Sequence, residues 1–460
     1  MMAAVGVRSR RSVRWGRVFL ATVLAAAAVA AGTPVLAQGS SAEVRAALRD
    51  DLPRDLRAFY AARNHAPLWM EAGRPGPAAD ALFQLIGTAD LDGLDRDDYR
   101  PRQLAAALDR AEKGNARDLA RADMLLSRAL VSLASDMRRQ RTDEMIYADR
   151  QLAPAAPTAR ELLDQAAHAP SLVQHVRAMG WMHPLYGQIR AAAADRLAGL
   201  DGQDLDGLDL AVVRRNLKRA AVLPAAAATG RYVLVDAAAA RLWMYEDGKV
   251  KGTMRVVVGK PSEPTPMMAG LIRYASINPY WNIPPDLVRL RVAPGAMKSG
   301  DAFLKAKRFQ LLSGWTTDAT PVSAKTVDWR AVQDGRIDAR VRQLPGPGNA
   351  MGRIKFMFPN ELGVYLHDTP EKELLRQSDR TFSSGCVRVE DAPRLAAWLF
   401  GKPVSLAGKT PDRRLDLREP VPVYLTYFTV AKDGDGLVYR DDVYGRDGRD
   451  DDGDRQVAAR

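Results

Sequence analysis

The hydrophobic pattern of the chain changes its period at Arg231. Before this point, stretches such as Ala116 to Gln140 repeat apolar residues every three or four positions, the spacing of an amphipathic helix. After it, short apolar runs such as 232–235 are separated by turn residues, which is typical of β-strands. We therefore expect an α+β protein, with a helical region over 42–220 and a mostly-β domain over 230–444.

One long segment, 287–344, interrupts the strand pattern of the second region. Its sequence is less regular and contains two tryptophans, Trp315 and Trp329. Loops of this length inside a compact domain usually have a function of their own. We expect an inserted unit here rather than a simple connection.

The two ends of the chain differ from the rest. Five arginines precede an apolar run from Val18 to Ala31, and Val35-Leu36-Ala37 follows, which resembles a cleavage pattern and predicts a secretory signal peptide over 1–37. The apolar run is too short for a comfortable transmembrane helix, so we expect an exported protein that is not integral to the membrane after cleavage. The segment 445–460 is rich in aspartate and poor in apolar residues, which predicts a disordered acidic tail.

The net charge and the positions of the histidines limit the kinds of molecule and metal that we expect the protein to bind. The formal net charge of +12 falls to +7 without the five leader arginines, which no acidic residue offsets. We expect an anionic envelope polymer as the electrostatic partner. We expect no nucleic-acid partner, because no basic-aromatic motif is present and an exported protein rarely meets nucleic acid. Four of the five histidines lie in the helical region without cysteines beside them, so we expect them on helix surfaces and predict no metal or other cofactor.

Cys386 is the only cysteine among 460 residues, so it has no partner within the chain for a disulfide. It follows three small residues, 383–385, which allow a tight turn whose N–H groups point at one spot. His367 is the only histidine from Pro184 to the C-terminus and is the natural candidate for its base. Spacing alone leaves a second interpretation open, in which Cys386 is a buried structural residue near an unrelated histidine.

Two runs around these residues, 365–370 (YLHDTP) and 380–391 (RTFSSGCVRVED), resemble the active-site signature of the L,D-transpeptidases of the YkuD superfamily. The resemblance is closest to the large periplasmic YcbB-like branch. It extends in the family's order from about Arg231 to Tyr444, through 256–260 with Thr265-Pro266, 278–285 and 344–356. It implies a YkuD-type catalytic domain with 287–344 as a capping lid, preceded by a helical scaffold domain.

The resemblance assigns roles at the site. Cys386 would be the nucleophile that forms a thioester, and His367 would carry protons to and from it. Backbone N–H groups of Ser384, Gly385 and Cys386 would stabilise the oxyanion. Many relatives have histidine at the position of Ser384, and the YcbB-like branch has serine. Sequence leaves open which group orients His367, and a backbone carbonyl is one candidate. We do not expect a direct contact with the side chain of Asp368, because adjacent strand residues point to opposite faces.

Arg388 has two interpretations: it fixes the turn or attracts a substrate carboxylate, or it forms a local ion pair with Glu390 or Asp391. Aromatic residues could line the cleft or belong to the core, and Asn278 and Asn349 could contact the peptide or shape turns. The residues expected to bind the substrate are Tyr365, Trp281, Asn278, Phe382 and Ser383.

By resemblance, the protein is an exported, periplasmic peptidoglycan L,D-transpeptidase that forms 3–3 cross-links from tetrapeptide stems. The partners would be stem peptides and other cell-wall synthesis proteins. With water as acceptor it would be an L,D-carboxypeptidase, and with a protein amine it would anchor that protein to peptidoglycan. A non-catalytic wall-binding protein is a further alternative, but it would be expected to have lost the cysteine or the histidine. The stretch 191–223 is too short for the peptidoglycan-binding module that larger relatives carry there.

Overall fold

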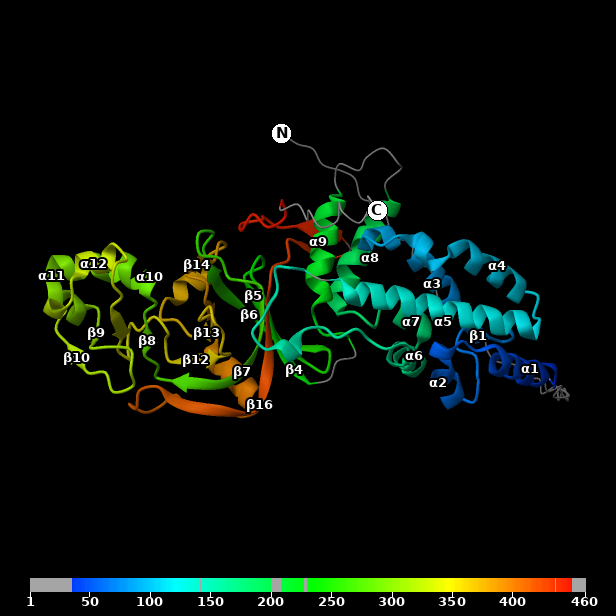
Figure 1. Cartoon of the computed structure of the whole chain (residues 1–460), viewed down its shortest axis with the longest axis horizontal. Helices are drawn as coiled ribbons and strands as arrows, with labels where there is room; N and C mark the ends of the chain where they lie inside the picture. Colours follow the sequence, from blue (N-terminus) through cyan, green and yellow to red (C-terminus); the bar gives the residue numbers. More distant parts are fainter. Residues whose placement is uncertain (1–34, 141, 200–207, 227–229, 435, 449–460) are drawn as a thin grey trace, which may run out of the picture.

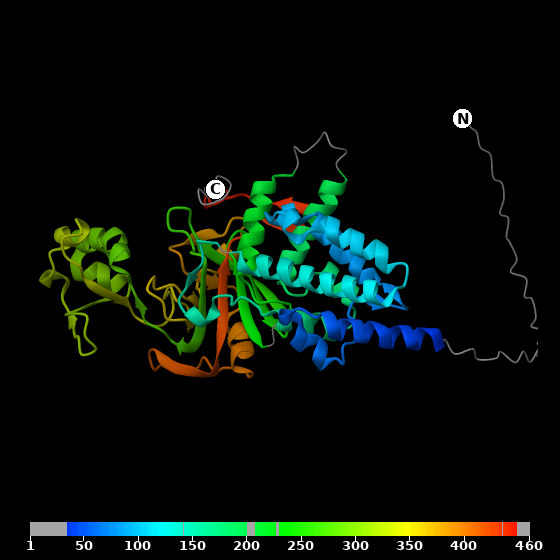
Figure 2. The same ribbon diagram turned by 45° about the vertical axis from the view of Figure 1, so that its right-hand side comes forward.

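The computed structural model describes residues 35–140, 142–199, 208–226, 230–434 and 436–448. The expected signal peptide lies outside these residues apart from 35–37, which begin a helix, and residues 449–460 of the expected tail also lie outside them. The chain is laid out as a helical region at one end, a β-sheet domain in the middle and a small mixed unit at the other end (Figures 1 and 2). This arrangement confirms the α+β class predicted from the change of period.

Helices form the first region. They are α1 (Val35–Asp51), α2 (Arg54–Ala62), α3 (Pro77–Gly87), α4 (Pro101–Ala111), α5 (Ala116–Arg139), α6 (Ala159–His168), α7 (Leu172–Arg177), α8 (Pro184–Ala198) and α9 (Leu210–Ala221). Helix α5 begins where the Asn115 side chain accepts hydrogen bonds from the N–H groups of Arg117 and Asp118, an N-cap. Its apolar residues at helical spacing are buried, as predicted. No described helix combines the length and the apolar character that crossing a membrane requires.

The middle domain is built on a ten-stranded sheet. Its main strands are β4 (Arg231–Asp236), β5 (Arg241–Glu246), β6 (Lys249–Gly259), β7 (Met268–Ile277), β12 (Ile354–Met357), β13 (Leu366–His367), β14 (Thr381–Ser383), β15 (Val387–Val389) and β16 (Arg413–Thr426). They lie in the order β12-β13-β15-β6-β5-β4-β16-β7, and β12 pairs with β7 as well, so the sheet closes on itself. Helix α13 (Ala392–Phe400) follows β15. The short strands β13 and β15 lie inside the sheet, between β12 and β6, and the pairing of β12 with β7 leaves no exposed edge beside them among the described strands.

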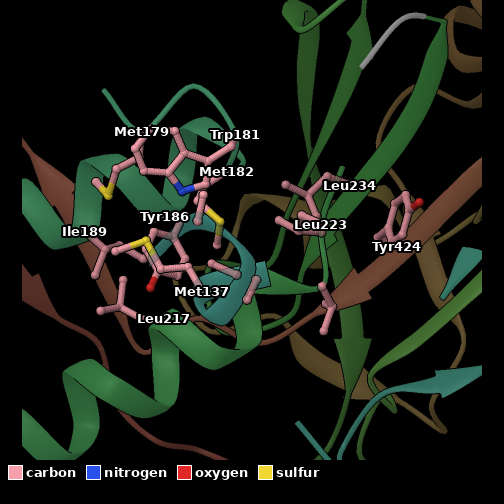
Figure 3. Packing of buried hydrophobic residues seen from close by; sticks show 14 of the residues in the cluster. Met137, Met179, Trp181, Met182, Tyr186, Ile189, Leu217, Leu223, Leu234 and Tyr424 are labelled. Atoms are coloured by element: carbon pink, nitrogen blue, oxygen red, sulfur yellow. The ribbon is translucent and has the colours of Figure 1, made fainter. Parts of the chain in front are cut away.

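The helical region and the sheet share one core. Strand β3 (Ile146–Tyr147) comes from the helical region and pairs in parallel with β7. Trp181, Met182 and Tyr186 pack in the same hydrophobic cluster as Leu234 and Tyr424 of the sheet (Figure 3). The helical region and the sheet domain are therefore packed together as one unit.

His183 joins these two regions and corrects the expectation of a helix-surface histidine. It is fully buried, its Nδ1 accepts from the Leu185 N–H, and its Nε2 lies 2.8 Å from the Tyr232 hydroxyl. Burial lowers the pKa of His183 to about 3, so the imidazole is neutral. Helical spacing could not reveal this position, because the burial comes from a strand that lies far away in sequence.

The unit at the far end is compact, not irregular. It contains β8 (Trp281–Asn282), α10 (Pro285–Leu287), the π-helical stretch η5 (Val288–Val292), α11 (Ala293–Ala306), β9 (Phe309–Leu312), β10 (Pro321–Val322), α12 (Trp329–Gln333) and β11 (Arg340–Gln343). Its strands form a sheet in the order β10-β9-β11-β8, and its buried residues form a hydrophobic cluster of their own. We call residues 281–343 the insert.

The chain remains packed beyond Tyr444, where a disordered tail was expected to begin. A small hairpin, β17 (Val430–Asp433) with β18 (Gly436–Tyr439), precedes it. The buried Arg219 of α9 pairs with Asp447 at 2.8 Å and with Glu144 at 3.1 Å. Composition suggested disorder because it does not show that an aspartate has a buried arginine as its partner.

Candidate active site

Two short parallel strands bring the key residues of the sequence motif to one face. Leu366 pairs with Val387 across β13 and β15, and both are buried in the core. Side chains alternate along a strand, so Tyr365 and His367 share the opposite face with Cys386 and Arg388. The backbone N–H of Val387 donates to the carbonyl of Tyr365, which fixes this register.

A cavity of about 350 Å³ lies over that face. Its walls come from both the sheet and the insert, so the site is formed between them. The sheet contributes Tyr365, His367, Ser383, Ser384, Cys386 and Arg388, and the insert contributes Trp281, Ile283, Leu287, Arg291, Val292 and Phe309.

His367 is buried and held in one orientation by the chain itself. Its Nδ1 lies 2.6 Å from the carbonyl oxygen of Asp368. A carbonyl only accepts hydrogen bonds, so Nδ1 carries the proton and Nε2 keeps a free lone pair. The carboxylate of Asp368 faces elsewhere and accepts from the Arg353 N–H and from Lys372 Nζ. The orienting group, which sequence left open, is therefore a backbone carbonyl.

Burial, assisted by the charge of Arg388, lowers the pKa of His367 to about 3. Burial also raises the pKa of the Cys386 thiol to about 11, although hydrogen bonds from the Tyr365 backbone and hydroxyl and the charge of Arg388 oppose this. Both groups are consequently neutral near pH 7 in the resting site. Nε2 of the imidazole is a base that acquires its proton only as the thiol loses one.

Residues 383–386, which we call the nucleophile turn, are held by hydrogen bonds within the turn and from the buried Thr265 behind it. The Ser383 hydroxyl donates to the Cys386 carbonyl at 2.6 Å and accepts from the Gly385 N–H at 3.2 Å. Gly385 has a φ of 99°, a conformation that side chains disfavour. Behind it, the buried Thr265 hydroxyl donates to the Gly385 carbonyl at 2.9 Å.

This geometry changes the expected role of Gly385. Its N–H is used within the turn, so Gly385 contributes shape rather than the oxyanion donor inferred from sequence. Ser383 likewise supports the turn, with its hydroxyl committed on both sides. The sequence does not show whether a serine hydroxyl such as that of Ser383 forms hydrogen bonds within a turn or faces a substrate.

Arg388 lines the cavity and forms an ion pair with Glu371. The local partners considered from the sequence are engaged elsewhere: Glu390 pairs with Arg255, and Asp391 caps helix α13. The local ion-pair alternative therefore named the wrong acids. Glu371 comes from the segment after β13, which sequence proximity to Arg388 does not indicate.

The expected substrate-binding residues separate into two groups. Tyr365 and Trp281 line the cavity, and the Tyr365 ring lies edge-on to His367 with centroids 5.7 Å apart. Phe382 is exposed and does not line the cavity, because alternation on β14 turns Ser383 inward and Phe382 outward. Asn278 lines a different cavity, with φ of 53° and its amide bonded to the carbonyls of Lys409 and Thr410.

Asn349 also acts within the fold. It is buried, and its amide donates to the carbonyls of Pro279, Gln343 and Leu344. The turn-shaping interpretation is correct for this residue.

Sequence reasoning missed Arg291. This residue lies on η5 of the insert, and its Nη2 donates to the Ser384 Oγ at 2.9 Å. It reaches the nucleophile turn from a segment that shares no motif with it. Only the docking of the insert onto the sheet brings the two together.

Two family models match the chain: the Scaffold domain over residues 54–192 and the L,D-transpeptidase catalytic domain, YkuD, over residues 230–411. The chain carries a YkuD L,D-transpeptidase catalytic domain. The domain match includes His367, Cys386 and Arg388. It supports peptidoglycan L,D-transpeptidase activity as the class of function.

One curated protein and two solved structures are similar to parts of the chain. A Haemophilus influenzae protein assigned to the L,D-transpeptidases is 26% identical over 405 residues, covering 85% of this chain and 78% of that protein. An L,D-transpeptidase from Mycobacterium smegmatis is 14% identical, with a TM-score of 0.21, over 43% of this chain and 59% of its own. The catalytic domain of the E. faecium L,D-transpeptidase is 19% identical, with a TM-score of 0.19, over 43% of this chain and 98% of its own. This chain thus spans less than two thirds of the M. smegmatis structure.

Proposed function

We propose that this YkuD L,D-transpeptidase is exported and forms 3–3 cross-links in peptidoglycan through a thioester on Cys386. The observation that carries the proposal is the pairing of Cys386 with His367 on one face of a cavity, with the free lone pair of His367 at Nε2. Cysteine with a neutral, oriented imidazole is the arrangement that nucleophilic acyl transfer requires.

The first half of the reaction releases D-alanine. Nε2 of His367 takes the thiol proton while Sγ of Cys386 attacks the carbonyl of the third residue of a tetrapeptide stem. The bond to D-alanine then breaks, and the imidazolium returns the proton to the leaving amine. A thioester on Cys386 remains.

The second half forms the cross-link. The side-chain amine of a neighbouring stem attacks the thioester and passes a proton to Nε2, and the departing thiolate of Cys386 recovers it. Burial lowers the pKa of His367, so the imidazolium is a strong acid that gives up its proton readily in both halves.

The oxyanion requires donors in addition to the base. Among the described residues, no hydrogen bond engages the N–H of Cys386, in contrast to that of Gly385. We assign the main oxyanion contact to the Cys386 N–H, with Ser384 adjacent to it. Arg388 holds positive charge beside the imidazole and supports the anionic intermediate.

The predicted leader supports action outside the cytoplasm, in the periplasm, where peptidoglycan lies. Without an evident wall-binding module, the basic surface and the cleft itself would hold the anionic wall. Other cell-wall synthesis proteins are the expected protein partners.

Choice of acceptor distinguishes the proposal from its alternatives. The insert contributes one wall of the cavity with apolar residues, including Ile283, Leu287 and Val292. A dry cavity favours a bound amine over bulk water. This favours transpeptidation over the L,D-carboxypeptidase activity, and the same chemistry with a protein amine would give wall anchoring.

The test uses residues 38–460 and purified muropeptides. We expect D-alanine release from tetrapeptide stems and dimers joined between two third-position residues, both absent in Cys386→Ala. Accumulation of tripeptides without dimers at high acceptor concentration would instead identify a carboxypeptidase. Pentapeptide stems should be poor donors, and equal turnover of both stems would contradict the donor assignment.

A further inference from the structure

Two arginines reach the cavity, and their charges are in different states. Arg388, on the sheet, is ion-paired with Glu371 and largely buried. Arg291, on the insert, is exposed, and it donates a hydrogen bond to a neutral hydroxyl, that of Ser384. A carboxylate entering the cavity therefore meets one arginine that already has an acidic partner and one whose guanidinium bonds an uncharged group.

The acid whose charge interacts with Arg291 has a basic partner of its own. Glu263 pairs with Lys260 at 2.8 Å. Partial burial alone would raise the pKa of Glu263, but the contacts with Lys260 and Ser384, with the charge of Arg291, outweigh it and lower the pKa. Glu263 is thus an anion whose charge Lys260 offsets.

The backbone that carries Arg291 is rigid although its side chain is exposed. Val288 and Val292 flank it on η5, and both are completely buried in the insert's own cluster. π-Helical stretches of this kind occur often at functional sites. The guanidinium is consequently presented towards the nucleophile turn from a fixed base.

Distance supports a direct role in substrate binding. Ser384 lies two residues before Cys386, so their Cα atoms are at most about 7 Å apart. The carboxylate of the residue that follows the scissile bond lies roughly one residue length, about 3.5 Å, from the carbonyl under attack. A guanidinium bonded to Ser384 is within reach of that carboxylate when the carbonyl is at Sγ.

We propose that Arg291 binds the terminal carboxylate of the donor stem and so selects donors that end one residue after the scissile bond. The inference rests on the proposed function and names the residue that reads the substrate's end. Arginine is suited to this task because its planar fork binds both carboxylate oxygens. A donor that is longer by one residue would place an amide where the carboxylate is required.

The test compares two donors that differ only in this charge: a tetrapeptide stem with a free terminal carboxylate and the same stem with a terminal primary amide. Release of D-alanine or D-alaninamide is followed by mass spectrometry, and kcat/KM is taken for each. A charge-assisted hydrogen bond contributes about 1.5–3 kcal/mol, so we expect the protein to prefer the acid at least about tenfold. In Arg291→Gln this preference should fall to near one, while Arg291→Lys should retain part of it.

Arg289→Gln is the matched control. Arg289 lies on the same π-helical stretch and is exposed, but it does not line the cavity, so its acid-to-amide ratio should equal that of the unmodified protein. Turnover of both donors without preference, or an unchanged ratio in Arg291→Gln, would overturn the inference alone. Failure of the unmodified protein to process either donor would overturn the proposed function and this inference with it.

Discussion

The nucleophile turn is supported very differently on its two sides. Behind it, Thr265 bonds Gly385, and the C-terminal segment bonds the same loop: Tyr444 donates to the Gly259 carbonyl at 2.7 Å and Arg446 to the Thr265 carbonyl at 3.1 Å. In front of it, the insert has a hydrophobic cluster separate from the main one and contacts the turn through Arg291. The rear is built to hold position, whereas the front is a separately packed unit that can move without disturbing the core.

The rear support extends into the helical region. Arg219 of α9 is buried, and its guanidinium joins Glu144 to Asp447, while its Nη2 also donates to the Arg446 carbonyl. A continuous set of contacts thus connects the scaffold, the C-terminal segment and the loop behind Cys386. We infer that the scaffold serves catalysis by fixing the turn.

The largest effect should come from the turn itself. Cys386→Ser should keep the fold but abolish turnover, because a serine hydroxyl is far harder to ionise than a thiol near neutral pH. His367→Ala should lose on the order of 10² or more in rate if Nε2 is the general base. Rates are measured as D-alanine release, with thermal unfolding to check the fold. Activity of the Ser variant above a few per cent would remove Cys386 from its assigned role.

Next in size is the rear support. Arg219→Ala leaves two acids facing a buried gap, and removing one partner of a buried ion pair costs about 3–5 kcal/mol. We expect a clear fall in Tm, measured by circular dichroism. Arg214→Ala, on the same helix with an exposed contact to the Asp90 carbonyl, should change stability little. Equal effects of the two variants would show that the buried pairing adds nothing.

Removal of most of the insert should change the ratio of reaction products rather than the stability of the β core. Arg342 pairs with Asn282 across β11 and β8, so a short Gly-Ser turn can replace residues 284–341. The β core should still fold, cross-linking should decrease, and hydrolysis should rise relative to it, because a lid orders substrate and excludes water. Liquid chromatography of the muropeptide products gives the ratio. If the rates and the ratio of cross-linked to hydrolysed products are unchanged, the insert has no role in choosing the acceptor.

The smallest effect concerns pH. The pKa of His367 and that of His183 are both about 3 in the folded protein, below the ordinary value near 6.5. The unfolded chain therefore binds more protons between these values, and stability falls as pH decreases from about 6.5 towards 3. Each buried histidine contributes a slope of about 1.4 kcal/mol per pH unit in that window. The free energy of unfolding, measured by urea denaturation at several pH values, should depend less steeply on pH in His367→Gln than in the unmodified protein. An identical pH dependence would contradict a neutral buried imidazole.

What sequence could predict follows from how local each signal is. The helical period of α5, the strand runs from Arg231 and the short motif around Cys386 are properties of consecutive residues; they predicted the fold class, and they singled out Cys386 and His367, which line one cavity. Arg291 and Glu371 reach the site only through docking of distant segments, so no spacing indicated them. Phe382 and Ser383 were grouped together because sequence does not show which way β14 faces.

The order of the strands has a consequence for how the chain is made. Strand β16 lies between β4 and β7, although it comes after all the other strands of that sheet in the sequence. A polypeptide that emerges N-terminus first therefore presents His367 and Cys386 before the strand that joins β4 to β7 and completes the closed sheet. A chain that ends before β16 would contain both of these residues but would lack the strand that closes the sheet around them.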